Sequence, residues 1–483
     1  MQTERSVKTN ALLNIIKQCC NILLPLITYP YISRVVGAAS LGRFSFADSI
    51  VQYAIILATL GAPAYAIREG ARVRDNKKEI TALSAKIFTI NIISMLVSLF
   101  VLTLLLIFSS RINKETTLIL ILCINMVSTV LGRDWINSIY EEFLFITLRY
   151  IIFQVLALIF LFMFVKSPDD LIIYTVIVMF GNAGAQIANI FHTAKIVPYR
   201  IHFSKDLLVH LKPILYMFGI SVASIIYINS DITILGFMRS EQEVGVYYIV
   251  GKVYTIIKAL LNAIITVSVP RLSYYLGKND TNGYRQLLSS LRIYLYTFII
   301  PCIVGLFMLS ENILKIIGGN EYSDGVNAFR LLCSAMFFAV FACFYSQSIL
   351  IPNRKENVFM AATIISAIIN VILNLIFIPL MGIRGAALTT LISEIVVLLI
   401  CSYKSRKLHD DFGTRGMLPI AAGSLSIVVI CIAVKYLPIN YILQTILSVI
   451  CSVISYSVFL IIGKNQAAVS FLSKFSGYLN KKQ

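Results

Sequence analysis

The chain has little charge and few of the residue types that carry catalysis. Of its 483 residues only 13% are charged and 58% are hydrophobic, with a mean hydropathy of +0.84. A soluble domain carries about 25% charged residues, so the composition excludes an ordinary globular protein. The nine cysteines lie in apolar stretches without a CxxC pair, which indicates small buried residues rather than disulfides or metal ligands. The four histidines, His192, His202, His210 and His409, also lack metal-ligand spacing.

Motifs for nucleotide hydrolysis are missing as well. The segment from Gly245 to Lys252 resembles a phosphate-binding loop, but it has five intervening residues instead of four and Val253 where Ser or Thr belongs. No ATPase domain fits in the short loops. We therefore expect a protein that is not an enzyme, holds no cofactor or metal and is not driven directly by ATP.

Most of the sequence consists of long apolar stretches. A helix that crosses a bilayer needs about 20 apolar residues, and the sequence predicts fourteen such spans. They cover residues 11–33, 44–64, 81–108, 115–137, 143–165, 171–194, 213–236, 246–270, 286–309, 325–350, 357–378, 385–405, 416–437 and 440–463. The expected fold class is an all-α polytopic membrane protein with 14 transmembrane helices.

The net charge of +18 follows this topology rather than indicating nucleic-acid binding. With a cytoplasmic N-terminus, 23 of the 41 Lys and Arg residues fall in cytoplasmic loops and tails, and eight fall in outer loops. This asymmetry is the positive-inside rule. It predicts that both termini and the basic loop at residues 68–78 are cytoplasmic.

Two segments of the chain resemble each other. A glycine-aromatic pattern at Gly42 and Phe44 leads into the second span, and the same pattern at Gly245 and Tyr247 leads into the eighth. Six spans separate the copies, which predicts two parallel six-helix halves around a central cavity. The expected domains are an N-lobe at 1–212, a C-lobe at 213–412 and two further helices with a cytoplasmic tail at 413–483. Chance similarity of short membrane segments is the alternative.

Several charges lie inside the predicted spans, and Lys258 lies deepest. It is about 18 Å from the outer end of its span at 1.5 Å per residue, where an ammonium group costs roughly 3 kcal/mol or more without water or an anion. The pattern therefore favours a hydrated interior that binds something polar or anionic.

Other candidate substrate-binding residues have plausible structural alternatives. Asn14, Lys17 and Asn21 share one face of the first span, but they could serve interhelical hydrogen bonding, and Lys17 could snorkel. Lys252 could pair with Asp231 in a structural ion pair. The remaining candidates of this class are Arg149, Arg330 and Asn370. Glu394 and Asp48 are candidates for ion coupling, and Glu394 could equally serve helix packing.

Five segments resemble one family of transporters. They are Trp135–Arg149 (WINSIYEEFLFITLR), Val165–Asp170, Tyr29–Phe46, Arg68–Arg72 and Met381–Ala387. They are similar to Wzx-type polysaccharide repeat-unit flippases of the multidrug/oligosaccharidyl-lipid/polysaccharide exporter superfamily. The resemblance covers about residues 10–405. The chain departs from the family pattern at residues 137–139, where the family shows an aromatic, a glutamine and a glycine, so a substrate role for that glutamine does not transfer.

The resemblance implies two six-helix lobes around a cavity, plus two extra helices, in the bacterial cytoplasmic membrane. It also implies a short oligosaccharide substrate linked by pyrophosphate to a polyprenol, flipped from the inner to the outer leaflet by alternating access. Membrane lipids and the polysaccharide polymerase or export machinery are the expected partners, and nucleic acid is not. Three alternatives stay open: a flippase for peptidoglycan lipid precursors, a multidrug/cation antiporter of the same superfamily, and a membrane-embedded glycosyltransferase or polymerase.

Overall fold

Helices are the regular secondary structure of the part of the chain that the structure describes. The computed structural model describes residues 7–204, 206–408 and 417–465, and these residues contain no strand. They divide into two compact units, Met1–Tyr248 and Ile249–Gln483, so the division falls inside one helix, α11. The expected all-α class is confirmed for the described residues.

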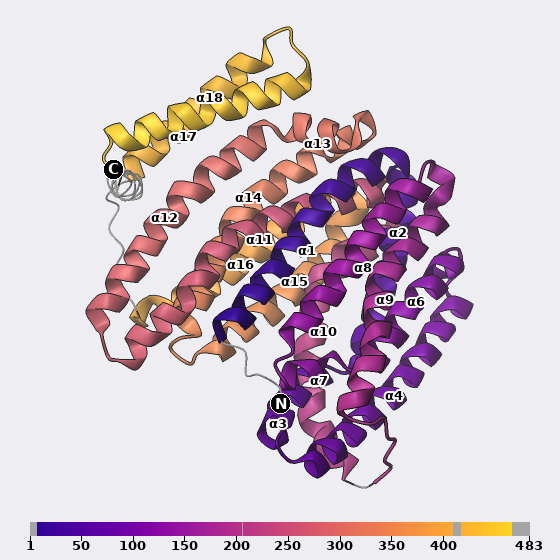
Figure 1. Ribbon diagram of the computed structural model, residues 1–483. Coiled ribbons are helices and arrows are strands. Elements are labelled where there is room, and N and C mark those ends of the chain that lie inside the picture. Colours follow the sequence, from indigo (N-terminus) through magenta and orange to yellow (C-terminus); the bar gives the residue numbers. More distant parts are fainter. Residues whose placement is uncertain (1–6, 205, 409–416, 466–483) are drawn as a thin grey trace, which may run out of the picture. The chain divides into compact units, whose positions relative to one another are not determined.

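Unit 1 is built from α1 to α10 and the first turns of α11 (Figure 1). The bounds are α1 Val7–Val35, α2 Ala38–Thr59, α3 Ala62–Val73, α4 Lys77–Phe108, α5 Ser110–Asn113, α6 Thr116–Gly132, α7 Asp134–Ile139, α8 Phe143–Phe164, α9 Leu171–Ile196, α10 Leu207–Met238 and α11 Glu241–Gly277, with a 3-10 turn η1 at Pro168–Asp170. Helix α2 packs on α4, α6 and α10, and α9 packs on α6 and α8.

Unit 2 contains the rest of α11 and all later helices. The bounds are α12 Thr281–Met308, α13 Ser310–Gly318, η2 Asn320–Gly325, α14 Val326–Cys343, a π-helical turn η3 at Phe344–Leu350, α15 Glu356–Met381, α16 Ile383–Ser405, η4 Arg406–Leu408, α17 Met417–Lys435 and α18 Tyr441–Ile462. Helices α14 and α15 pack on α16, and the pair α17 and α18 packs on α12.

Twelve helical segments of the described residues are long and apolar enough to cross a membrane, and α6 is a shorter apolar helix of 17 residues. The chain is therefore a multi-pass membrane protein. Each of the fourteen predicted spans contains a helix, but α1 and α6 are not among those twelve segments. The count of fourteen spans stays a prediction.

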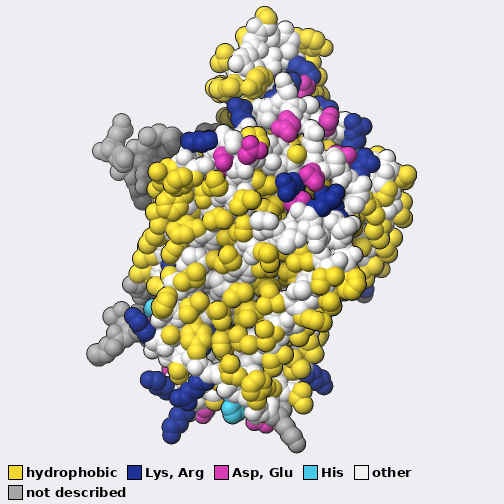
Figure 2. Space-filling model, turned by 90° about the vertical axis from the view of Figure 1, so that its right-hand side faces the viewer, with side chains coloured by type: hydrophobic (Ala, Val, Ile, Leu, Met, Phe, Trp, Pro, Cys, Tyr) yellow, Lys and Arg dark blue, Asp and Glu magenta, His cyan; other side chains and the backbone are white. Residues whose placement is uncertain are grey.

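The surface has the pattern that a bilayer requires. One face shows a broad band of hydrophobic side chains, with Lys, Arg, Asp and Glu gathered above and below it (Figure 2). On α4, for example, Leu96, Phe100 and Phe108 are 58%, 64% and 82% exposed. Such exposure would be costly in water and is favourable in lipid.

Charged contacts mark two opposite ends of unit 1. At the end that carries the basic loop 68–78, called the basic end here, Arg74 pairs with Glu141 at 3.1 Å. At the other end, Arg111 pairs with Glu241 at 3.0 Å, and the 1% exposed Glu115 pairs with Arg43. The loops expected on opposite sides of the membrane thus lie apart within this unit. Which end faces the cytoplasm stays a prediction.

The two similar glycine segments contact each other in unit 1. A Cβ atom added at Gly42 would lie 1.8 Å from the carbonyl oxygen of Glu241, and one added at Gly245 would lie 1.7 Å from that of Ala38. The contacts are reciprocal, since each glycine faces the residue four positions before the other. Only glycine permits this backbone approach between α2 and α11.

Helix α10 follows the boundary expected between the two lobes. It was expected to open the C-lobe at residue 213, and it packs on α2, α3 and α4. The left-handed turn at Leu60 and Gly61 between α2 and α3 admits α10 closely, because a Cβ at Gly61 would lie 3.0 Å from the backbone of Met217. The lobes at 1–212 and 213–412 stay a prediction.

Candidate functional site

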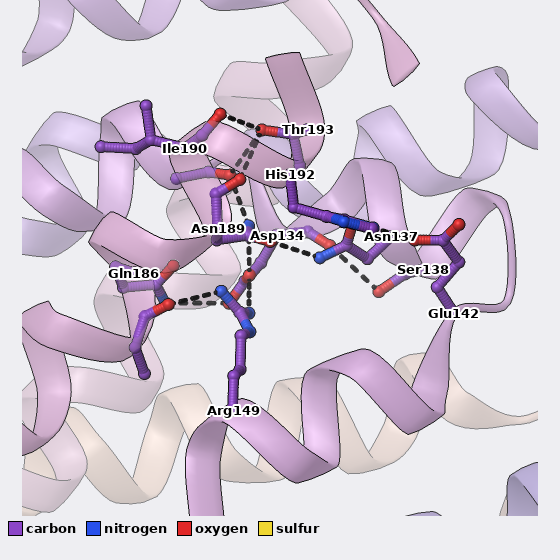
Figure 3. A network of polar contacts seen from close by, with 12 residues as sticks. Asp134, Asn137, Ser138, Glu142, Arg149, Gln186, Asn189, Ile190, His192 and Thr193 are labelled. Atoms are coloured by element: carbon purple, nitrogen blue, oxygen red, sulfur yellow. Dashed lines mark hydrogen bonds and ion pairs between the residues drawn. The ribbon is translucent and has the colours of Figure 1, made fainter. Parts of the chain in front are cut away.

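A polar network around Asp134 lies inside unit 1 (Figure 3). Asp134 is the first residue of α7 and accepts hydrogen bonds from Arg149 of α8 and from two residues of α9. Gln186 donates to it at 2.8 Å and Asn189 donates at 2.8 Å. Asn137 extends the network by donating to Asn189 at 2.6 Å. Three helices thus converge on one carboxylate.

The network combines deep burial with an open carboxylate. The side chain of Arg149 is 6% exposed and also donates to the carbonyl oxygen of Ala185 at 2.9 Å. The side chain of Asp134 is 43% exposed. Three buried polar atoms, Arg149 Nε, Asn137 Oδ1 and Gln186 Oε1, have no hydrogen-bond partner among the described residues. Buried polar atoms normally find a partner, so this site has unused capacity for hydrogen bonds.

The stripe on α1 approaches the same network. Lys17 is half-buried, and its Nζ lies 5.5 Å from the centroid of the Tyr150 ring, which follows Arg149 directly on α8. Asn21 is half-buried one turn further along. The side chain of Asn14 lies outside the described residues. The structure therefore brings two predicted residues, Lys17 and Arg149, to one site.

A histidine–carboxylate contact borders the network towards the basic end. His192 of α9 contacts the carboxylate of Glu142, and its ring stacks on Phe145 with centroids 3.8 Å apart. Such a planar, partly exposed aromatic surface beside amides and a carboxylate has the chemistry that sugar rings and hydroxyls require.

Lys258 lies in unit 2 with an anionic partner. Its Nζ lies 3.2 Å from Oε1 of Glu394, a residue in the middle of α16. Tyr254, one turn before Lys258 on α11, donates its hydroxyl to the same oxygen at 3.0 Å. The side chain of Lys258 is 25% exposed, whereas that of Glu394 is 7% exposed. The structure thus joins a predicted substrate residue to a predicted coupling residue.

The remaining candidates lie in separate places. Arg330 donates to the hydroxyl of Ser310 at 3.0 Å, and Asp48 accepts from Gln52 at 3.2 Å. Lys252 is half-buried on α11, and its expected pairing with Asp231 stays a prediction, while Asp231 accepts from Tyr247 at 2.6 Å.

Asn370 takes part in helix packing. It is 1% exposed and accepts from Asn374, which in turn binds Thr389 of α16. Contact between Asn370 and a substrate would require α15 and α16 to separate. Its substrate role stays a prediction. Its hydrogen bond with Asn374 lies within α15, and Asn374 makes the bond to α16.

Unit 2 also holds a cavity of about 1040 Å³ between α12, α17 and α18. Its lining is mainly apolar and includes Phe298, Leu306, Ile427, Val449 and Leu460. A charged headgroup would lose its hydration there without compensation, so this cavity suits hydrocarbon rather than the polar part of a ligand.

Sequence reasoning missed Asp134, Gln186, Asn189 and Tyr254. Two signals were available. Asp134 stands directly before the Trp135–Arg149 segment, and Gln186 and Asn189 are three residues apart, on one helical face. Neither signal identifies a partner on another helix.

The chain matches one protein family over more than half of its length. The family is described as "Polysaccharide biosynthesis protein", and the match covers residues 7–276. The chain belongs to this family. The matched part includes the whole of unit 1 that the structure describes, with the Asp134 network, and the part of α11 that carries Lys258.

Curated relatives support this membership. The putative O-antigen transporter of Escherichia coli K12 is 24% identical over 413 residues, which cover 83% of this chain and 98% of that protein. A probable low-salt glycan biosynthesis flippase of Haloferax volcanii is 25% identical over 173 residues, 36% of each chain.

Solved structures show the same fold. The lipid II flippase MurJ in an inward closed conformation superposes with a TM-score of 0.75 at 18% identity, covering 93% of this chain and 99% of that one. An inward-facing multidrug transporter of the MATE family, in the MOP superfamily, reaches 0.59 at 15% identity, with 84% and 96% covered. These likenesses show the fold, while the family match and the curated relatives confirm the expected resemblance to polysaccharide flippases.

Proposed function

We propose that this member of the polysaccharide biosynthesis family is a flippase for polyprenyl-pyrophosphate-linked oligosaccharide repeat units. It moves them from the inner to the outer leaflet of the bacterial cytoplasmic membrane by alternating access. The observation that carries the proposal is the match along 98% of the length of a putative O-antigen transporter, within a family named for polysaccharide biosynthesis. We further propose fourteen spans, both termini in the cytoplasm and two lobes around a central cavity.

The charges of the described residues support an anionic, sugar-bearing substrate. Lys17, Arg149 and Lys258 are cations within helices of a membrane protein, where each needs an anion or water. Asp134 and Glu394 supply an anion to Arg149 and Lys258, and a pyrophosphate offers the same kind of charge-assisted hydrogen bond. The amides and the open carboxylate of the Asp134 network suit sugar hydroxyls, and the apolar cavity beside α18 suits the hydrocarbon of a polyprenol.

The other functions have less support. A multidrug/cation antiporter would favour acidic over basic residues in its binding site. The candidate substrate-binding residue that lies deepest in its predicted span is instead a lysine, Lys258. A peptidoglycan precursor flippase shares the anionic lipid, but its resemblance here is of fold alone. The curated relatives that match in sequence include a putative O-antigen transporter and a probable low-salt glycan biosynthesis flippase. Nothing in the described residues resembles the site of a glycosyltransferase.

Flipping in reconstituted vesicles tests the proposal. A fluorescent polyprenyl-diphosphate oligosaccharide is placed in both leaflets of the vesicles. The decrease of its fluorescence after addition of a membrane-impermeant quencher is followed with and without the protein. We expect protein-dependent exposure of the inner pool for the oligosaccharide lipid and little for a cationic drug. If the peptidoglycan precursor is flipped as fast as the oligosaccharide lipid, the peptidoglycan precursor flippase is favoured. If no diphosphate lipid is flipped, the proposal is refuted.

Lys258 is the first residue to test within this function. Lys258→Ala should reduce flipping at equal amounts of folded protein, and Lys258→Arg should retain more activity, since its charge survives with altered geometry. Undiminished flipping by the alanine variant would remove Lys258 from the mechanism.

A further inference from the structure

The pairing of Lys258 with Glu394 raises a question that the proposed function leaves open. A substrate anion and the Glu394 carboxylate have the same chemistry towards an ammonium group. Both are oxygen anions that accept hydrogen bonds from a lysine. Lys258 cannot offer its full charge to a pyrophosphate while Glu394 holds it at 3.2 Å.

We propose that Glu394 is a specificity-determining residue that occupies Lys258 as an internal substitute for the substrate's phosphate. The substrate anion exchanges with it for the ammonium group. This inference rests on the proposed function and assigns Glu394 a role in selecting anionic lipids. No bond is formed or broken covalently, since the step exchanges one ionic contact for another.

The geometry around Glu394 allows the exchange. Tyr254 and Lys258 are four residues apart on α11, so both face α16 from one side of the helix. Both donate to the same oxygen, Glu394 Oε1, at 3.0 and 3.2 Å. When Lys258 turns away, the Tyr254 hydroxyl still donates to Glu394. The carboxylate therefore keeps one partner during the exchange.

The exposure of Lys258 and Glu394 determines which of the two side chains an incoming anion contacts first. Lys258 is 25% exposed and Glu394 is 7% exposed, so a ligand reaches the ammonium group before the carboxylate. Lysine also has a flexible four-carbon stem, which permits the group to swing between two anions. The Nζ atom lies 4.7 Å from the centroid of the Tyr254 ring, a contact that supports the cation in its resting position.

The exchange also explains how a neutral lipid would be refused. A lipid without phosphate offers nothing to replace Glu394, so it leaves the pair intact and gains no binding energy from Lys258. A diphosphate supplies the replacement anion. The same pair therefore stabilises the protein without substrate and discriminates between lipid headgroups.

Equilibrium binding of a defined probe separates this role from a merely structural pair. The probe is a short-chain polyprenyl diphosphate carrying one N-acetylglucosamine, with the matching polyprenyl glycoside without phosphate as the neutral probe. Glu394→Gln removes the competing anion and should bind the diphosphate about tenfold more tightly, or ~1.4 kcal/mol. Lys258→Ala should bind it about tenfold more weakly. Neither variant should change binding of the neutral probe.

The double variant Lys258→Ala/Glu394→Gln gives the decisive comparison. Since Glu394 acts through the lysine, it should bind the diphosphate as weakly as Lys258→Ala alone. Glu356→Gln is the matched control, because Glu356 is an exposed carboxylate at the start of α15 in the same unit. It should bind both probes like the unaltered protein.

Stability measurements guard against misfolding. Each single variant leaves one charge without its partner and should melt at a lower temperature, while the double variant should melt closer to the unaltered protein. Unchanged or weaker diphosphate binding by folded Glu394→Gln would overturn the exchange. The exchange would also be overturned if Glu394→Gln raised the affinity for the diphosphate equally in the presence of Lys258 and in the Lys258→Ala background. Failure of the unaltered protein to bind the diphosphate probe would overturn the proposed function as well, which distinguishes the two failures.

Discussion

Replacement of Asp134 by asparagine is expected to destabilise unit 1 measurably. The substitution keeps the size of the side chain but removes the charge that faces Arg149, which is only 6% exposed. Removing one partner of a buried ion pair costs about 3–5 kcal/mol. The side chain of Asp134 is 43% exposed, so water compensates part of this loss, and we expect about 2 kcal/mol. Part of that cost is the lost charge-assisted bond to Gln186.

The chain carries its own reporter for this experiment. Trp135 is the only tryptophan, follows Asp134 directly and is 3% exposed, so its fluorescence reports unfolding of this region. Reactivity of the buried Cys333 and Cys401, followed for each cysteine by mass spectrometry, reports unit 2 separately. Asp134→Asn should lower the midpoint of the Trp135 transition by a few degrees and leave the cysteine transition unchanged. The matched control is Asp75→Asn at a fully exposed carboxylate. Equal midpoints for the two variants would refute the reasoning.

Three further predictions follow from other parts of the fold. Gly42→Ala should destabilise the contact between α2 and α11 by about 1–3 kcal/mol through overpacking, measured by thermal unfolding, whereas Gly219→Ala, with nothing within 4 Å of the added atom, should not. The hydrogen bond from Lys315 lowers the pKa of Glu311, a residue of α13, which is not among the candidate spans. Its contribution is therefore present above the usual pKa of 4.5 and is lost as the pH falls through the lowered value. Glu311→Gln should lower the melting temperature slightly at pH 7, and this effect should shrink as the pH falls below 4.5. Cysteines introduced at residues 68–78 should react with impermeant reagents only from the cytoplasmic side, and labelling from outside would reverse the proposed orientation.

The amino-acid sequence by itself determined that the chain crosses a membrane many times and that Lys258 lies deep within a helix. Both conclusions depend on local properties, the length of apolar stretches and the rise of a helix. The glycine pattern at Gly42 and Gly245 also marked two related segments, and the structure places them in reciprocal contact. The sequence could not indicate that α10 packs on α2, because a membrane-spanning helix has the same hydropathy whichever unit it belongs to.

Only the tertiary structure decided the partners of the buried charges. Lys258 and Glu394 are 136 residues apart, and their contact depends on how α11 and α16 pack. Arg149 was recognisable as a buried cation, whereas Asp134, Gln186 and Asn189 became a site only when α7 and α9 met α8. Helical periodicity states which residues share a face of one helix. Helical periodicity does not predict which faces of different helices contact each other, because those contacts depend on the packing of the whole bundle.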